Sequence, residues 1–368
     1  MTGENADASR RSDPQVSHAE FLACRRFESL DGLRAISILA VIWHHTAATA
    51  FGGGLLAYTG TEGVTLFFAI SGFLITTLLL RERHRTGLID LRAFYVRRAL
   101  RIFPLYYAVL MVYLVLVVVL ERNSAVGGQF FRNLPYFLTY TSNWFVPLDG
   151  RVIFYFAWSL AAEEQFYLVW PALMNRLKTG ARALVVIAAV TAVLIGIESL
   201  PVSDPFPGPD VRWFVTKVPL AIMLGVMAGL ALDSPRGFSF LRPCVGSRGA
   251  SVLWMLAVAA FGFLGAPRFV LHSAMVGLVI SCVVNPRHWV AFALNWPPLA
   301  YVGKISYGMY LVHMLCKNLS VRILTKLSPE PGWSLIFLTT TVLAVVAAGL
   351  SFRFFESSFL SRKVAFER

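Results

Sequence analysis

The chain has 368 residues, of which 57% are hydrophobic and only 14% are charged. Water-soluble domains carry about 45–50% apolar and about 25% charged residues, so this composition excludes an ordinary soluble enzyme, a disordered protein and a disulfide scaffold. The apolar runs are continuous rather than alternating, which favours helices over a transmembrane barrel. We therefore expect an all-α, polytopic membrane helical bundle.

The net charge is +13, from 33 Lys and Arg against 20 Asp and Glu. The basic residues lie in short segments between apolar runs, which indicates contact with anionic lipid headgroups and no nucleic-acid partner. The cysteines are Cys24, Cys244, Cys282 and Cys316, and no pair has metal-ligand spacing. We expect free thiols and no metal site.

In chain order, residues 1–30 are polar and lack the apolar core of a signal peptide, which predicts a mobile cytoplasmic tail. About ten transmembrane helices are predicted to follow. The short aromatic segment 130–146 is expected to lie along the membrane interface. The ten predicted ranges are about 33–51, 63–81, 103–120, 154–174, 182–199, 215–232, 250–265, 268–285, 303–321 and 334–352.

The distribution of basic residues predicts the orientation of these segments. With the N-terminus in the cytoplasm, most of the 33 Lys and Arg fall on the cytoplasmic side, as the positive-inside rule requires. The sequence thus predicts an N-in, C-in topology, with a short cytoplasmic tail over 357–368. A permease would show the same pattern.

Ionisable residues inside predicted spans point to function, because a charge at mid-bilayer costs roughly 2.5–3.5 kcal/mol. The first span reads LDGLRAISILAVIWHHT and holds Arg34 and His45. In a helix these two lie within about 20° of one face and about 16 Å apart along the axis. The alternative is that Arg34 reaches the membrane surface and His45 only packs and hydrogen-bonds.

The fourth span begins FYFAWSLAAEEQFYLVWP. Ser159, Glu163 and Tyr167 recur every four residues and share one helix face, whereas Glu164 is turned by one position. Two adjacent carboxylates in an apolar helix each need a partner or a proton. The alternative places this start of the span at the outer interface, with both carboxylates reaching water.

Two further polar clusters stand out. Arg97, Arg98 and Arg101 form an RRxxR motif before the third span. Guanidinium groups match phosphate oxygens, although a positive-inside stop signal is the alternative. The ninth span, GKISYGMYLVHM, carries Tyr307 and His313, which on one helix more often pack and hydrogen-bond than catalyse.

Taken together, these motifs resemble the acyltransferase 3 family, bacterial polytopic enzymes that move acyl groups from acyl-CoA onto sugars and related hydroxyls. The matching region is expected to be one transmembrane domain over 31–356. Where the family usually shows an Arg-x-Asp-like pair, the sixth span has Lys217 and Pro219, so no role is assigned there. We expect no further extracytoplasmic domain. The matching pieces are LDGLRAISILAVIWHH, GVTLFFAISGFLI, YVRRALRIFPLYY, WSLAAEEQFYLVWP and GKISYGMYLVH.

The resemblance implies acyl-CoA as a co-substrate and no permanently bound cofactor. It implies that His45 is a general base for the acceptor hydroxyl, oriented by Glu163 or Glu164. A variant in which His45 itself carries the acyl group remains open. The residues expected to bind the CoA phosphates are Arg34, Arg97, Arg98 and Arg101, and those expected to support the site are Ser159, Tyr167, Tyr307 and His313.

The acceptor implied by the resemblance is a carbohydrate, such as a surface polysaccharide or a lipid-linked sugar, acylated in the bacterial cytoplasmic membrane. Acetyl is the expected acyl group, and a separate protein that handles the acceptor is a further expected partner. The alternatives are acylation of a secreted small molecule or macrolide, and a proton-coupled transporter or flippase. A transporter would move its substrate without acyl-CoA.

Overall fold

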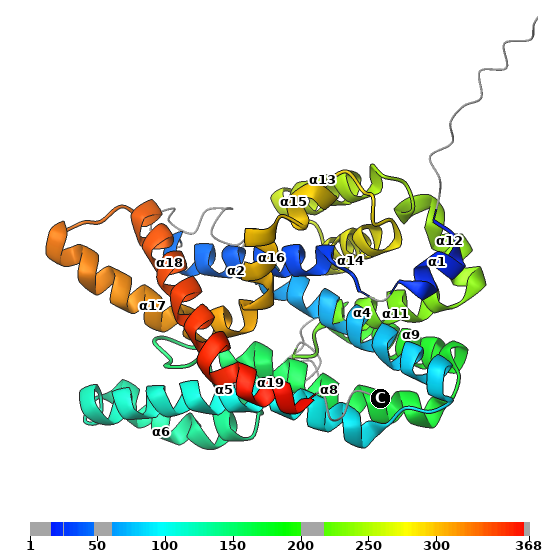
Figure 1. Ribbon diagram of the computed structural model, residues 1–368. Helices are drawn as coiled ribbons and strands as arrows, with labels where there is room; N and C mark the ends of the chain where they lie inside the picture. The colour runs from blue at the N-terminus through cyan, green and yellow to red at the C-terminus, as the bar shows by residue number, and fades with distance from the viewer. Residues whose placement is uncertain (1–15, 25, 48–60, 200–216, 364–368) are drawn as a thin grey trace, which may run out of the picture.

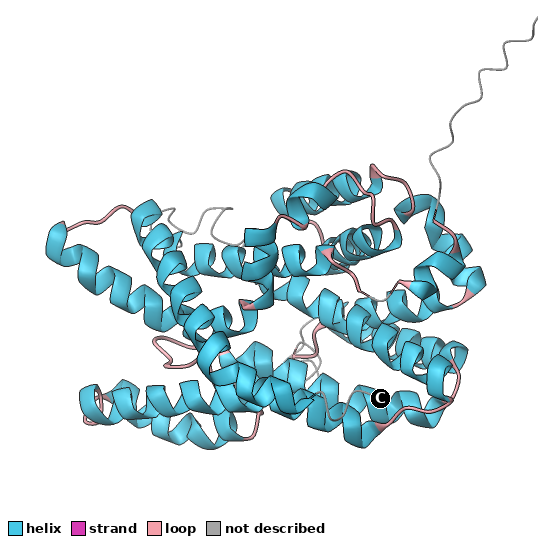
Figure 2. Ribbon diagram, in the orientation of Figure 1, coloured by secondary structure: helices cyan, strands magenta, loops and turns pink. Residues whose placement is uncertain are grey.

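A computed structural model describes residues 16–24, 26–47, 61–199 and 217–363. These residues contain helices and no strand, which confirms the all-α prediction for this part of the chain (Figure 2). The helices are α1 (His18–Ala23), α2 (Ser29–Ala47), α4 (Thr61–Thr86), α5 (Leu91–Leu120), α6 (Ala125–Leu138), α7 (Ser142–Phe145), α8 (Ala157–Leu177), α9 (Gly180–Ser199), α11 (Leu220–Asp233), α12 (Pro235–Val245), α13 (Ala250–Phe263), α14 (Arg268–Val284), α15 (Ala291–Leu294), α16 (Pro297–Lys304), α17 (Ser306–Leu327), α18 (Trp333–Ser351), the π-helix η1 (Phe352–Glu356) and α19 (Ser357–Lys363).

A helix occupies each of the ten predicted ranges, namely α2, α4, α5, α8, α9, α11, α13, α14, α17 and α18. Among the described residues, four helices are long and apolar enough to cross a membrane: Thr61–Thr86, Leu91–Leu120, Gly180–Ile197 and Trp333–Arg362. The pair α12 and α13, bent by 73°, makes a fifth if it counts as one span. Ten crossings and the N-in orientation therefore stay predictions. Residues 48–51 and 215–216 of the predicted spans lie outside the described residues.

The predicted tails differ from the structure where they are described. Residues 1–15 lie outside the described part, but α1 begins with a capping box between Ser17 and Glu20. The Phe21 side chain is only 3% exposed, and the His18 ring packs at a tilt against Phe238 of α12, with the ring centroids 5.1 Å apart. Aromatic contacts of His18 and Phe21 thus attach this end of the predicted tail to the bundle. At the other end, α19 continues the last helix and packs against α5.

The segment 130–146, expected at the membrane interface, falls on α6 and α7. The Tyr106 hydroxyl of α5 donates to the Phe137 carbonyl of α6 at 2.8 Å, so the segment packs against the bundle. Figure 1 shows α6 lying beside α5. Its depth in the membrane stays a prediction.

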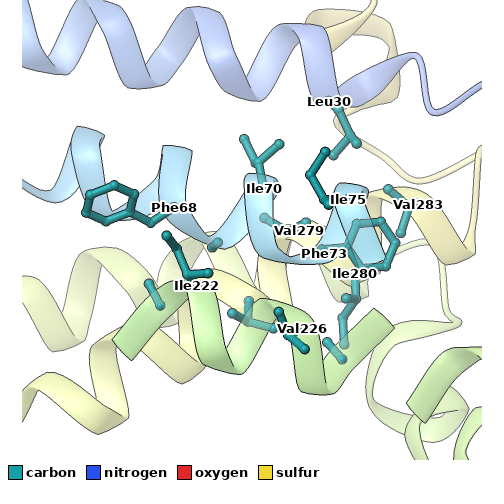
Figure 3. Packing of buried hydrophobic residues seen from close by; sticks show 14 of the residues in the cluster. Leu30, Phe68, Ile70, Phe73, Ile75, Ile222, Val226, Val279, Ile280 and Val283 are labelled. Carbon is teal, nitrogen blue, oxygen red and sulfur yellow. The ribbon is translucent and has the colours of Figure 1, made fainter. Parts of the chain in front are cut away.

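The larger apolar core lies between α2, α4, α11 and α14 (Figure 3). Leu30, Ile70, Ile222 and Val279 meet there, each at most 2% exposed. Apolar helix faces gain stability by this burial within the protein.

Helices α4 and α11 approach one another at glycines. A Cβ at Gly72 would overlap the Ile222 carbonyl oxygen, and one at Gly225 would lie 2.5 Å from the Ala69 carbonyl oxygen. Small residues at such crossings let membrane helices pack backbone to backbone. The contact fixes α4, whose Ser71 faces the site described next.

Candidate active site

A cavity of about 90 Å³ lies among α2, α4, α5, α8 and α17, and we call it the arginine cavity. Three guanidinium groups and two carboxylates face this small volume, among hydroxyl and apolar side chains. A space of this size holds several water molecules or a thin chain. Its polar lining residues are Arg34, Ser71, Arg98, Arg101, Ser159, Glu163, Glu164, Tyr167, Ser306, Tyr307 and Tyr310.

Glu163 is held by hydroxyl groups from two helices. The Ser71 hydroxyl of α4 and the Tyr167 hydroxyl, one turn along α8, both donate to Glu163 Oε1. The two hydroxyl oxygens lie 3.0 Å apart. The Arg98 guanidinium lies 4.4 Å from the centre of the Tyr167 ring, a cation–π contact. Hydroxyl groups and an aromatic face therefore connect the carboxylate to an arginine.

Three further charged groups line the arginine cavity, namely Arg34, Arg101 and Glu164. Arg34 is paired with Asp31 on its own helix, with Nη1 3.2 Å from Oδ1. Arg101 lines the cavity and stays exposed, and Glu164 lines it beside Glu163. With Asp31 counted, three guanidinium groups face three carboxylates, and the guanidinium groups of Arg98 and Arg101 offer N–H donors that suit an anionic ligand.

Arg97 faces away from this cavity, because consecutive helix residues point about 100° apart. Its guanidinium lies 3.4 Å from Glu82. Both residues line a larger neighbouring cavity of about 1490 Å³, together with Arg81 and Arg85. The RRxxR motif thus contributes to two cavities: Arg98 and Arg101 line the arginine cavity, and Arg97 lines the larger neighbouring one.

His45 lies near the C-terminal end of α2, outside the lining of the arginine cavity. Its Nδ1 is 2.9 Å from the hydroxyl of Tyr155, just before α8. Its ring stacks on His313 of α17 with centroids 5.1 Å apart, and His44 packs against its edge at 4.9 Å. The described residues thus surround this imidazole with aromatic groups rather than carboxylates.

His313 links this pair to the arginine cavity. It is fully buried, and its Nδ1 donates to the Tyr310 carbonyl at 2.5 Å. That bond leaves Nε2 as the acceptor nitrogen, and it has no partner among the described residues. The Tyr310 hydroxyl lies 2.6 Å from Ser159 Oγ, and both groups line the arginine cavity. One layer of side chains therefore separates that cavity from His45.

Eight of the residues predicted for the site line the arginine cavity: Arg34, Arg98, Arg101, Ser159, Glu163, Glu164, Tyr167 and Tyr307. His45, His313 and Arg97 lie elsewhere. The carboxylate expected to orient His45 accepts hydrogen bonds from Ser71 and Tyr167, and the hydroxyl that contacts His45 is that of Tyr155.

Ser71, Tyr155 and Tyr310 were not among the predicted site residues, although each lies in or beside one of the sequence motifs. A single hydroxyl in an apolar helix carries no pattern that marks it. One usable signal was that Tyr310 lies three residues before His313, on the same helix face.

Comparison with known proteins identifies the region that carries this site. Residues 27–351 match the family described as acyltransferase domain. The chain is 29% identical to the putative peptidoglycan O-acetyltransferase YrhL of Bacillus subtilis, over 90% of this chain and 54% of that protein. It is 27% identical to the peptidoglycan O-acetyltransferase OatA of Listeria monocytogenes, over 89% of this chain and 55% of that protein.

A putative O-acetyltransferase of Staphylococcus aureus is 30% identical, over 91% of this chain and 57% of that protein. The chain thus spans little more than half the length of the curated relatives it matches. No solved structure matches the chain. The matched region contains every helix that lines the arginine cavity and the His45 layer.

Proposed function

The chain belongs to the acyltransferase domain family, and from this membership we propose that it is an integral membrane O-acyltransferase. It transfers an acyl group, most simply acetyl, from acyl-CoA to a hydroxyl of a carbohydrate acceptor. Relatives named as O-acetyltransferases support the acetyl group, and two relatives named for peptidoglycan support a carbohydrate. The apolar helices support a membrane location, which we propose is the bacterial cytoplasmic membrane.

The donor enters through the arginine cavity. Acyl-CoA joins a nucleotide with several phosphate charges to a thin arm that ends in the thioester. The arginine cavity is narrow, which suits the arm, and its three guanidinium groups attract the anion. The neighbouring cavity with Arg97 is large enough for the nucleotide part. With the predicted N-in orientation, both cavities face the cytoplasm.

In this proposal His45 is the catalytic base, and the thioester passes Tyr310 to reach it. The imidazole takes the proton from the acceptor hydroxyl, and the hydroxyl oxygen attacks the thioester carbonyl carbon. The carbon–sulfur bond breaks, and the CoA thiolate leaves with the proton returned by His45. In the two-step form, the imidazole nitrogen attacks first and the acyl group then passes to the acceptor.

Glu163 and Glu164 act on the donor side in this scheme. Glu163 accepts hydrogen bonds from the Ser71 and Tyr167 hydroxyls, and the Arg98 guanidinium packs over the Tyr167 ring. Glu163 is thus a positioning residue for the phosphate-binding arginine. Ser159 and Tyr310 fix the layer between donor and imidazole.

The observation that carries the proposal is the side-chain layer itself. Arg34 and His45 share one helix, yet Arg34 lines the arginine cavity and His45 lies one layer of side chains beyond it. This order suits a donor with a charged head and a reactive tail, whose thioester must pass the side-chain layer of Ser159 and Tyr310 to reach His45.

The test measures acyl-CoA-dependent transfer to glycans in membranes that contain the full chain. His45→Ala should abolish transfer, whereas the control His272→Ala, on α14 and outside the lining of both donor cavities, should keep most of it. Arg98→Ala with Arg101→Ala should raise KM for acyl-CoA at least tenfold. Arg92→Ala is the matched control, because Arg92 is exposed on the same helix and lines neither donor cavity. Full turnover in His45→Ala would refute the proposal.

A further inference from the structure

A third cavity, of about 610 Å³, lies on the other side of His45, and we call it the tyrosine cavity. Tyr155, whose hydroxyl contacts His45, is one of its lining residues. Its volume falls within the range of about 300–1,000 Å³ typical of small-molecule sites. The lining residues that the argument uses are Tyr113, Arg151, Tyr155, Met314 and Asn318.

Two helices show that the two cavities are stacked along the bundle. On α5, Arg101 lines the arginine cavity and Tyr113 lines the tyrosine cavity, about 18 Å further along the axis. On α17, Tyr310 lines the first and Asn318 the second, about 12 Å apart. Both helices pass the cavities in the same chain direction, and His45 lies between them.

One residue that lines the tyrosine cavity, Tyr113, carries a buried hydroxyl without a hydrogen-bonding partner among the described residues. Tyr113 is only 6% exposed. A ligand that hydrogen-bonds the Tyr113 hydroxyl would give this buried group a partner.

The charge at the rim favours a neutral ligand. Arg151 lines the cavity but is already paired with Glu121 at 3.0 Å. The Ser124 hydroxyl and the Arg151 guanidinium hold the pKa of Glu121 below its usual value, so this pair is ionised at neutral pH. The Asn318 amide and the tyrosine hydroxyls supply uncharged donors and acceptors beside aromatic walls.

From these observations we infer that the tyrosine cavity binds the acceptor, a neutral carbohydrate whose hydroxyl is presented to His45 beside Tyr155. The inference rests on the proposed function and deepens it by placing the acceptor opposite the donor. Sugar rings pack on aromatic side chains through their apolar faces while their hydroxyls bond to amide and phenol groups. With the N-in orientation, the tyrosine cavity opens to the extracytoplasmic side.

Accessibility tests the position of the cavity without any catalytic readout. Asn318→Cys in intact cells should react with a membrane-impermeant maleimide, because Asn318 is exposed and lines the cavity. The wild type, with its four native cysteines, gives the background. Ser71→Cys in the arginine cavity is the control and should react only after the cells are opened. Labelling of Asn318→Cys only in opened cells would overturn the assignment.

Binding and kinetics test the ligand. Chitotriose, an uncharged oligosaccharide of N-acetylglucosamine, is titrated against the purified full chain in nanodiscs without acyl-CoA. Asn318→Leu and Tyr113→Phe should each weaken binding at least fivefold, whereas Arg92→Ala should leave it unchanged. In transfer assays the same two variants should raise KM for chitotriose and leave KM for acetyl-CoA within twofold.

The outcomes separate this inference from the proposed function. Chitotriose binding that depends on Asn318, without any acetyl transfer, would refute the function and support the cavity assignment. Acetyl transfer with an unchanged KM for chitotriose in both variants would overturn the assignment and support the function. Absence of chitotriose binding by the wild type would also overturn the assignment.

Discussion

The hydroxyl of Tyr155 lies 2.9 Å from Nδ1 of His45, although the two residues are 110 positions apart in the chain. This contact takes the position that a carboxylate holds in a catalytic triad. A phenol orients an imidazole without placing a second charge in an apolar region, where an unpaired ion is costly.

Tyr155→Phe should lower kcat for acyl transfer about three- to tenfold, because one neutral hydrogen bond contributes about 0.5–1.5 kcal/mol. The KM for acyl-CoA should not change, since Tyr155 does not line the arginine cavity. Steady-state kinetics in nanodiscs would measure both constants. Tyr107→Phe is the control, because that hydroxyl donates to the Leu138 carbonyl at 3.0 Å, on α6 and away from His45. An unchanged kcat in Tyr155→Phe would remove this residue from the reaction.

Two substitutions of Tyr167 should separate its hydroxyl from its ring. Tyr167→Phe keeps the face on which Arg98 lies, so KM for acyl-CoA should stay within about threefold of wild type. Tyr167→Leu removes a cation–π contact of about 0.5–2 kcal/mol and should raise KM about three- to thirtyfold. Equal KM values for the two variants would show that the ring does not position Arg98.

The glycine contact between α4 and α11 predicts a stability effect. Gly225→Ala should lower the free energy of unfolding by roughly 1–3 kcal/mol, since its methyl group would meet the Ala69 carbonyl. At Gly196 in α9 an added Cβ would meet no atom of the described residues within 4 Å, so Gly196→Ala should be neutral or stabilising by up to about 1 kcal/mol. Thermal unfolding in detergent compares the two, and equal melting temperatures would contradict the close approach.

His288 predicts an acid-sensitive contact in the loop after α14. It is 2% exposed, and its Nε2 lies 3.0 Å from Ser29 Oγ. Burial lowers the pKa of His288 from 6.5 to about 4. The unfolded chain therefore takes up this proton first as the pH falls. Titration of His288 therefore leaves the free energy of unfolding unchanged above pH 6.5. As the pH is lowered toward 4, that free energy falls progressively, by up to about 3 kcal/mol.

The measurement is the melting temperature of the full chain in detergent between pH 7.5 and pH 4.5. Below pH 6.5 the wild type should lose stability more steeply than His288→Gln, which keeps a side-chain N–H and cannot titrate. Other groups titrate in both proteins, so the difference in slope isolates His288. Identical slopes would show that His288 is protonated equally in the folded and unfolded states.

Much of the fold was predictable because it depends on local properties of the chain. Continuous apolar runs predicted helices, and each predicted range contains one. The helix in the predicted N-terminal tail was missed, because α1 is held by contacts with α12 that no local pattern reveals. The depth and number of crossings depend on a membrane as well as on the chain.

The site was predictable in its parts and not in its pairing. Repeats of four placed Ser159, Glu163 and Tyr167 on one face of α8, and all three line one cavity. Glu163 or Glu164 was expected to orient His45, because two ionisable groups in apolar helices suggest a pair, whereas the contacts of Glu163 among the described residues are with Ser71 and Tyr167. Only the packing of α4 against α8 brings Ser71 to the carboxylate instead.

The sequence by itself determined an all-helical chain of this family, and it determined which residue types lie on each helix face, because both follow from composition and the helical period. The tertiary structure alone decided which faces meet. It placed Arg97 and Arg98 in different cavities and brought the Tyr155 hydroxyl into contact with His45. It also placed one cavity on each side of the imidazole. Such pairings are set by the crossing and rotation of helices far apart in the chain, which no local pattern encodes.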